Sequence, residues 1–295
     1  MNKILKYGLA ILLIGFGIVL VISITSNSTI FGINEENYTL TEESYASDDF
    51  DSINFDFDNR HVYITESPDD QIHVKFYLHE KDEMTYSDST AELNIEISRK
   101  WYFSIFTFDI FTNKDYFKVL LSLPTSTTVE NLDINTSNGE LELNVTNVFD
   151  SINLSTSNGR IDLVNFTVND LVANSSNGDV LAEEVVAINS IILKTSNGAI
   201  NLSKVTATNI KANTSNGRIT AENIISEDIS LDTSNGRIYL AVKGLKDDYR
   251  VTLSTSNGDE IYDGLKVASG TINTDGIYRI SLDSSNGDVE VTFVE

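Results

Sequence analysis

The sequence predicts an all-β protein: a single-stranded β-solenoid (β-helix) with coils of about 19–20 residues, preceded by one N-terminal transmembrane helix. Three observations predict this fold. A four-residue motif occurs eight times, apolar and polar residues alternate on both sides of each copy, and one long apolar run without charges lies near the N-terminus. The 295 residues, of which 41% are hydrophobic, are enough to bury a large core.

The apolar run covers residues 8–24 and follows Lys3 and Lys6. At about 1.5 Å per residue a helix of this length spans roughly 25 Å, close to the hydrocarbon thickness of a bilayer. The preceding lysines place the N-terminus in the cytoplasm. A cleaved signal peptide is the alternative, but "VISITSNS" offers no small-residue cleavage site. We therefore expect residues 1–25 to be a cytoplasmic stub and a retained single-pass anchor in the cell membrane, with the bulk of the chain extracellular.

Residues 26–48 are polar, acidic and without periodicity, which predicts a tether. From residue 49 onward the period is two. We expect residues 49–131 to form an irregular β part of the solenoid and residues 132–295 its regular repeats. The segment "INFDFDNRHVYI" at 53–64 aligns with "INLSTSNGRIDL" at 152–163, with Arg60 at the glycine position, where we expect a corner of different shape. The solenoid is thus predicted to begin before the regular repeats.

The repeated motif is [ST]SNG, here called the SNG turn, and its first six copies follow one another at steps of 19 or 20 residues. Apolar residues alternate before and after each turn, as in Ile152 and Leu154, then Ile161 and Leu163, which predicts strands with one buried face. The predicted structural turn and ladder residues are Asn138, Gly139, Asn158, Gly159, Asn177, Gly178, Asn197, Gly198, Asn216, Gly217, Asn235, Gly236, Asn257, Gly258, Asn286 and Gly287.

Asn-Gly between alternating strands is also typical of hairpins, so an antiparallel meander is the rival fold. A meander gives no physical reason for identical side chains at successive turns. In a solenoid equivalent residues lie about 4.8 Å apart, so the asparagines can hydrogen-bond as a ladder. We therefore favour the solenoid, with glycine supplying a left-handed backbone at each corner. Asn197 is expected in the middle of the ladder, and Asn286, in the last repeat, at its end.

Composition excludes several classes of function. The 20 basic and 44 acidic residues give a net charge of −24, which argues against a nucleic-acid partner. Cysteine is absent, which excludes disulfides and thiolate metal sites. His73 and His79 lie too far apart on one extended segment to bind one ion, and His61 is separate. We predict no catalytic, cofactor-binding or metal-binding residue and no cofactor, with diffuse weak cation binding left open.

The residue after each turn glycine is acidic in some repeats and arginine in others, which is typical of a solvated face. We expect Arg160 to pair with Glu140 and Asp179 across adjacent coils.

One aromatic cluster, "RKWYFSIFTFDIF" at 99–111, has two interpretations. It covers the first coil, because a solenoid must protect its open ends, or it is an exposed patch that meets a partner protein or the membrane surface. The candidate patch residues are Trp101, Tyr102, Phe103, Phe106, Phe108 and Phe111.

The N-terminal anchor, the segment "FDSINFDFDNRHVYITESPDDQIHVKFYLHE" and the recurring "TSNGxIxL" together resemble the bacterial putative adhesin family, domain of unknown function 4097. The resemblance covers about residues 50–295. It implies a single-stranded β-solenoid on the outer face of the membrane, and in some members an accessory role in cell-envelope stress. It supplies no catalytic residues.

We therefore expect a non-catalytic, membrane-anchored extracellular solenoid that serves as an interaction or adhesion surface or as a cell-envelope accessory protein. An envelope protein or a surface glycan is the expected partner, and no particular oligomeric state is predicted. The alternative is a carbohydrate-active β-helix enzyme. Such an enzyme needs a groove with clustered carboxylates and basic residues on neighbouring coils, whereas the repeat columns hold Asn, Thr and Ser.

Overall fold

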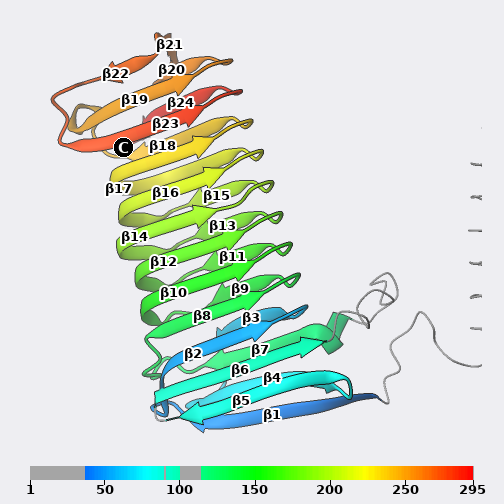
Figure 1. The fold of residues 1–295 in the computed structure, drawn as a ribbon. Helices are drawn as coiled ribbons and strands as arrows, with labels where there is room; N and C mark the ends of the chain where they lie inside the picture. The colour runs from blue at the N-terminus through cyan, green and yellow to red at the C-terminus, as the bar shows by residue number, and fades with distance from the viewer. Residues whose placement is uncertain (1–36, 90, 100–113, 295) are drawn as a thin grey trace, which may run out of the picture.

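The structure is a computed structural model that describes residues 37–89, 91–99 and 114–294. Within these ranges the regular elements are 24 strands and two short 3-10 helices, Lys114–Phe117 and Lys246–Asp248. The strands wind into coils that stack along one axis (Figure 1). No helix in the described part of the chain is long and apolar enough to cross a membrane. The predicted anchor at 8–24 lies outside the described residues.

Each coil contributes one strand to each of two long sheets. Sheet B contains β2 (Phe50–Phe57), β6 (Ala91–Arg99), β8 (Asn131–Thr136), β10 (Val148–Thr156), β12 (Thr167–Ser175), β14 (Val186–Lys194), β16 (Thr206–Thr214), β19 (Tyr249–Thr255) and β23 (Tyr278–Ser284). Sheet A contains β3 (His61–Glu66), β7 (Lys118–Leu123), β9 (Leu141–Asn144), β11 (Ile161–Val164), β13 (Val180–Glu183), β15 (Ile200–Ser203), β18 (Ile238–Lys243), β20 (Glu260–Tyr262) and β24 (Val289–Val294). Strand β17 (Ile219–Thr233) is continuous and contributes to both sheets.

Successive coils pair in parallel and in register, which distinguishes this arrangement from the meander. On sheet B, Leu154 lies opposite Ala173, which lies opposite Leu193 on the next coil. Large and small side chains therefore alternate along the buried column, and all three residues are fully buried. This alternation fills the interior because a leucine occupies the space left by the alanine on each side. The predicted all-β, mostly parallel, solenoid-like fold is confirmed.

The spatial order of the coils differs from the chain order at both ends. The coil β2–β3 lies between β6–β7 and β8–β9, because β2 pairs with both β6 and β8 and β3 pairs with both β7 and β9. The C-terminal coil β23–β24 lies between the coil ending in β18 and the coil β19–β20. Figure 1 shows the red strands β23 and β24 between the yellow and orange ones. The last coil in sequence is therefore not the last in space.

Antiparallel strands close both ends of the stack. At the N-terminal end β5 (Asp82–Ser89) pairs with β6, β4 (Gln71–His79) with β7, and β1 (Tyr38–Ala46) with β4. At the C-terminal end β21 (Leu265–Val267) pairs with β20 and β22 (Gly270–Ile272) with β19. These strands occupy edges that would otherwise accept another chain. The predicted tether is wrong in this part, because residues 38–46 form β1.

A buried ion cluster fixes the N-terminal cap to the first coils. Asp82, at the start of β5, accepts hydrogen bonds of 2.6 Å from the guanidinium groups of both Arg60 and Arg99. The side chains of Asp82 and Arg60 are only 2% and 4% exposed. Arg60 also donates to the Tyr116 carbonyl at 2.6 Å. Burial lowers the pKa of Arg60, and the Asp82 carboxylate opposes that effect.

Candidate functional site

The SNG turns stack along one edge, and their asparagines form a continuous hydrogen-bonded column. Each side-chain amide donates to the side-chain oxygen of the neighbouring asparagine, at 2.5–2.9 Å between Asn138 and Asn257. Asn138 also donates to Asn59, so the column extends into the coil that has Arg60 at the glycine position. In spatial order the column is Asn59, Asn138, Asn158, Asn177, Asn197, Asn216, Asn235, Asn286 and Asn257.

The expectation that Asn286 ends this ladder is wrong. Asn286 donates to Asn235 and accepts from Asn257, both at 2.9 Å. The reason is the insertion of β23–β24 beneath β19–β20, which makes Asn257 the terminal member.

The reason expected for the turn glycines is also wrong. None of the eight has a positive φ. Instead, a Cβ built on Gly198 would lie 2.0 Å from the carbonyl oxygen of Gly178 on the neighbouring coil, and the other seven would meet a backbone carbonyl at 1.6–2.3 Å. Glycine is therefore required because the coils approach too closely for any side chain.

The left-handed backbone lies at a different corner, where the chain passes from sheet A to sheet B, which at Asn223 happens within β17. Asn165, Glu184, Lys204 and Asn223 occupy equivalent positions there, with φ values of 61°, 55°, 55° and 56°. Asparagine tolerates this region well, whereas Glu184 and Lys204 do not. The latter two form an ion pair of 2.6 Å across adjacent coils. No glycine marks this corner in the sequence, which is why periodicity did not reveal it.

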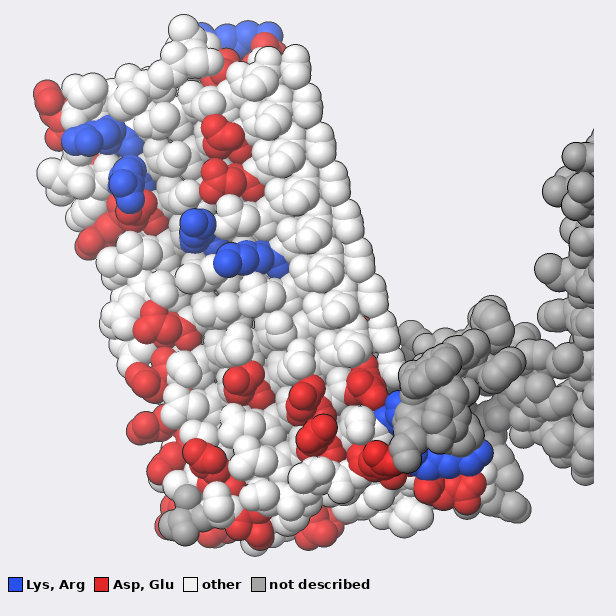
Figure 2. Space-filling model, in the orientation of Figure 1, with Lys and Arg blue, Asp and Glu red and all other residues white. Residues whose placement is uncertain are grey.

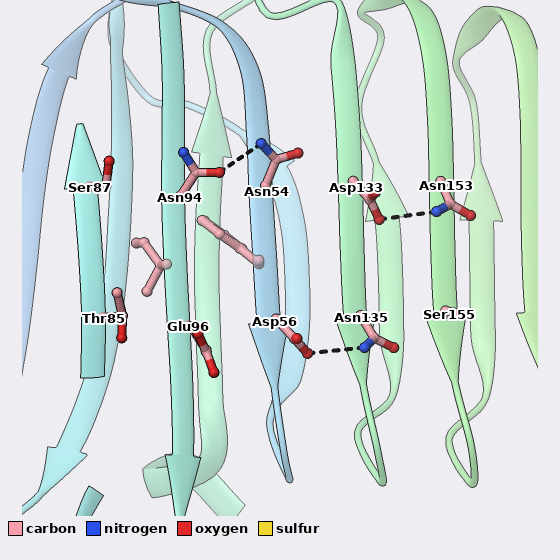
Figure 3. A pocket seen from close by; sticks show the side chains of 12 residues that line it. Asn54, Asp56, Thr85, Ser87, Asn94, Glu96, Asp133, Asn135, Asn153 and Ser155 are labelled. Carbon is pink, nitrogen blue, oxygen red and sulfur yellow. Dashed lines mark hydrogen bonds between the residues drawn. The ribbon is translucent and has the colours of Figure 1, made fainter. Parts of the chain in front are cut away.

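The outer face of sheet B presents polar side chains in columns, because every second residue of each strand points away from the core. At its N-terminal end Asn54 donates to Asn94 at 2.8 Å, Asn135 to Asp56 at 3.0 Å, and Asn153 to Asp133 at 3.1 Å (Figure 3). Every pair joins neighbouring strands, so the amides form a cross-strand network.

A groove of about 590 Å³ lies over this network. Its lining comprises Asn54, Phe55, Asp56, Thr85, Ser87, Asn94, Ile95, Glu96, Asp133, Asn135, Asn153 and Ser155. Strand β5 supplies one side through Thr85 and Ser87, and β10 supplies the other through Asn153 and Ser155 (Figure 3). The lining holds three carboxylates and no basic side chain. Sequence reasoning did not identify this groove, because its lining comes from the β5–β6 hairpin, β2, β8 and β10, and these segments lie side by side only in the folded chain.

Charge is distributed unevenly over the surface. Figure 2 shows acidic side chains gathered over the lower, N-terminal part of the molecule, and basic side chains near mid-height, at the upper end and at the lower right. A second hollow of about 540 Å³ lies farther along sheet B, with Lys194, Asn174 and Asn213 in its lining. Like-charge repulsion makes the N-terminal groove unfavourable for anions.

The other residues considered from the sequence do not converge. His73 contacts Asp69 and Ser44, each at 2.8 Å, and His61 lies 3.6 Å from Glu140. Among the described residues no group of His, Asp or Glu side chains is arranged to hold a metal ion. The expected cross-coil pairing of Arg160 is wrong in its partner, because Arg160 contacts Asp162 on its own coil at 2.5 Å. The six aromatic candidates at 101–111 lie outside the described residues.

The fold and the outer face define a class: an all-β, mostly parallel, solenoid-like protein with a polar groove near one end. The Toastrack DUF4097 family model matches residues 50–292, and the chain belongs to this family. No curated protein matches the sequence.

Solved structures with the same fold include proteins from Bacteroides and Parabacteroides species. A putative adhesin from Bacteroides fragilis is 15% identical, with a TM-score of 0.53 over 88% of this chain and 99% of that one. A putative adhesin from Parabacteroides distasonis is 15% identical, with a TM-score of 0.54 over 90% and 99%. A protein from the same species described as lipid-binding is also 15% identical, with a TM-score of 0.53 over 90% and 99%. At this identity the likeness establishes the fold.

Proposed function

We propose that this protein is a non-catalytic, membrane-anchored extracellular module, and that the outer face of sheet B is its adhesive surface. The observation that carries the proposal is the groove at the N-terminal end of that face, with its amide, hydroxyl and carboxylate lining. The adhesin descriptions of structural relatives agree with such a role.

The chemistry of the groove favours a neutral, hydroxyl-rich ligand such as a surface glycan. The Asn54, Asn94 and Asn153 amides each use one N–H or one oxygen within the network and retain others for a ligand. The carboxylates of Asp56 and Glu96 accept hydrogen bonds from sugar hydroxyls and repel anionic polymers. The groove is open to solvent and crosses several strands, which suits an extended chain better than an enclosed small molecule.

The uncharged run at residues 8–24 supports display at the cell surface. A retained anchor predicts that the full chain stays in the membrane fraction and begins near its initiator methionine. Recovery of a soluble form that begins shortly after Thr25 from unperturbed cells would contradict the anchor without affecting the binding proposal.

The groove also bears on the enzymatic alternative, because Asp56 and Glu96 lie directly opposite one another on β2 and β6. Glycoside hydrolysis uses two carboxylates on either side of the scissile bond. Both side chains here are exposed to water on an open face, whereas a general acid works from a desolvated site. We therefore assign these carboxylates to ligand binding.

The test is binding of the purified protein to an array of neutral and anionic glycans, followed by the two variants Asn94→Ala and Asn213→Ala. Both residues are half-exposed and lie on the same face, but only Asn94 lines the groove. We expect Asn94→Ala to weaken binding of a neutral glycan about three- to tenfold, as for loss of one or two hydrogen bonds, and Asn213→Ala to leave it unchanged.

Three outcomes would contradict the proposal. Equal losses in the two variants would remove the groove as the site, and binding confined to anionic glycans would remove the ligand class. Release of new reducing ends from a bound glycan would replace adhesion by catalysis.

A further inference from the structure

The sequence contains eight Asn-Gly pairs, and the asparagine of such a pair can lose its side-chain amide by deamidation. In an unconstrained chain the backbone nitrogen after asparagine attacks the side-chain amide carbon, and glycine at the second position permits this attack because it lacks a Cβ. The first question is therefore what restrains each pair in the folded protein.

Three restraints act on the turns within the stack. The asparagine amide is hydrogen-bonded on both sides, as for Asn197, which donates to Asn177 at 2.6 Å and accepts from Asn216 at 2.7 Å. The nitrogen that would attack is engaged, because Gly198 N–H donates to the Thr195 hydroxyl at 3.1 Å. The glycine is also buried against the carbonyl of the neighbouring coil.

The turn at Asn257 lacks these restraints on one side, because no further SNG turn stacks above it. Asn257 donates to Asn286 at 2.9 Å, and no donor in the described part of the chain reaches its side-chain oxygen. The Thr255 hydroxyl donates to the Gly287 carbonyl at 2.8 Å, and no bond from Gly258 N–H to that hydroxyl is present. Gly258 is exposed, whereas the other seven motif glycines are buried or half-buried.

The turn at Asn286 provides an internal comparison. Gly287 N–H likewise has no bond to the hydroxyl of Ser284, which donates to the Gly236 carbonyl at 2.9 Å. Asn286, however, is paired on both sides, with Asn235 and Asn257. Both turns therefore lack the hydrogen bond from the glycine N–H to the hydroxyl, but only the turn at Asn257 lacks a neighbouring turn on one side. Comparing their deamidation rates separates the two effects.

We propose that Asn257 is a site of spontaneous deamidation, and that the solenoid protects the Asn-Gly pairs stacked within it. The nitrogen of Gly258 forms a bond to Cγ of Asn257, the bond from Cγ to Nδ2 breaks, and the glycine proton leaves with ammonia. Water then opens the resulting cyclic imide to aspartate or isoaspartate. The product adds a negative charge and loses the amide that donates to Asn286, so the ladder ends one coil earlier.

The test is incubation of the purified full-length chain in mildly alkaline buffer at physiological temperature, with peptide mass spectrometry at each Asn-Gly pair. We expect Asn257 to convert at least about tenfold faster than Asn197, because reaction at a stacked turn requires local opening first. Asn286 should convert more slowly than Asn257. In concentrated urea all eight pairs should convert at similar rates.

Two results of this incubation would overturn the proposal. One is a folded protein in which Asn257 converts no faster than Asn197. The other is an order of deamidation rates among the eight pairs that stays the same in urea. Such a result would mean that the neighbouring sequence, and not the fold, sets the rates. The variant Asn257→Gln keeps an amide but disfavours the five-membered ring. It should abolish the early acidic species seen by ion exchange, and persistence of that species would place the reaction elsewhere.

Discussion

Individual residues of the SNG turn have separate physical tasks. The threonine or serine, which is buried at every turn except that of Thr255, donates a hydrogen bond to the neighbouring coil, as where Thr156 donates to the Gly139 carbonyl at 3.0 Å. The asparagine is exposed and continues the ladder, and the glycine allows the coils to approach. The motif is repeated because each task recurs at every coil.

The ladder predicts a difference between its middle and its end. Asn197→Ala removes two side-chain hydrogen bonds, whereas Asn257→Ala removes one. Because the amides are exposed, each bond contributes about 0.5 kcal/mol, so we expect losses of about 1 and 0.5 kcal/mol in the free energy of unfolding. Urea denaturation of both variants measures this, with Asn286→Ala expected to resemble Asn197→Ala. Equal losses for all three would contradict an energetic role for the ladder.

The turn glycines predict a larger effect. Gly198→Ala places a methyl group 2.0 Å from the Gly178 carbonyl oxygen, so adjacent coils must separate. We expect a loss of about 3 kcal/mol or more in the free energy of unfolding. Gly264→Ala is the control, because Gly264 has a φ of +78° but open space around it. It should cost only about 1 kcal/mol from backbone strain. A smaller loss for Gly198→Ala than for Gly264→Ala would refute the steric explanation.

At the scale of elements, the ends of the stack are built differently from its middle. The middle coils pair in parallel on both sides, whereas β4, β5, β21 and β22 run antiparallel to the coils they cover. A parallel strand requires a full coil to return the chain, but an antiparallel strand requires only a short turn. The hairpins β5–β6 and β20–β21 therefore close two edges with little chain, whereas β4 and β22 pair with strands farther away in the sequence.

The N-terminal cap depends on Asp82. Asp82→Asn leaves the guanidinium groups of Arg60 and Arg99 without a carboxylate in a buried site. We expect a loss of about 3–5 kcal/mol in the free energy of unfolding. Hydrogen exchange should show β4 and β5 opening before the central coils. Asp69→Asn, at an exposed pair with His73, is the control and should have no measurable effect. Unchanged protection of β5 in Asp82→Asn would show that strand pairing alone holds the cap.

At the scale of the whole molecule, a largely apolar core lies beneath a strongly acidic surface. The net charge of −24 opposes folding through self-repulsion, and on the face shown in Figure 2 the acidic side chains gather over the N-terminal part.

This charge predicts stabilisation by salt. Raising sodium chloride from low to moderate concentration should increase the urea midpoint, because the screening length falls from about 30 Å at 0.01 M to about 10 Å at 0.1 M. The increase should level off once the screening length is shorter than the spacing of surface charges. A midpoint that falls steadily with salt would indicate that ion pairs such as Arg279 with Asp228 outweigh the repulsion.

The sequence by itself determined the strands, their buried faces and the stacking of the turns. The strands and their buried faces follow from the period of two within each repeat. The stacking of the turns follows from the step of 19 or 20 residues between successive repeats. Ile152, Leu154 and Ile161 are buried as their alternation requires. Tertiary structure alone decided where the first and last coils insert, that residues 38–46 add a strand, and that the β5–β6 hairpin, β2, β8 and β10 together line a groove. These features depend on contacts between segments far apart in the chain, and no local period encodes which edge of a stack a returning strand will join.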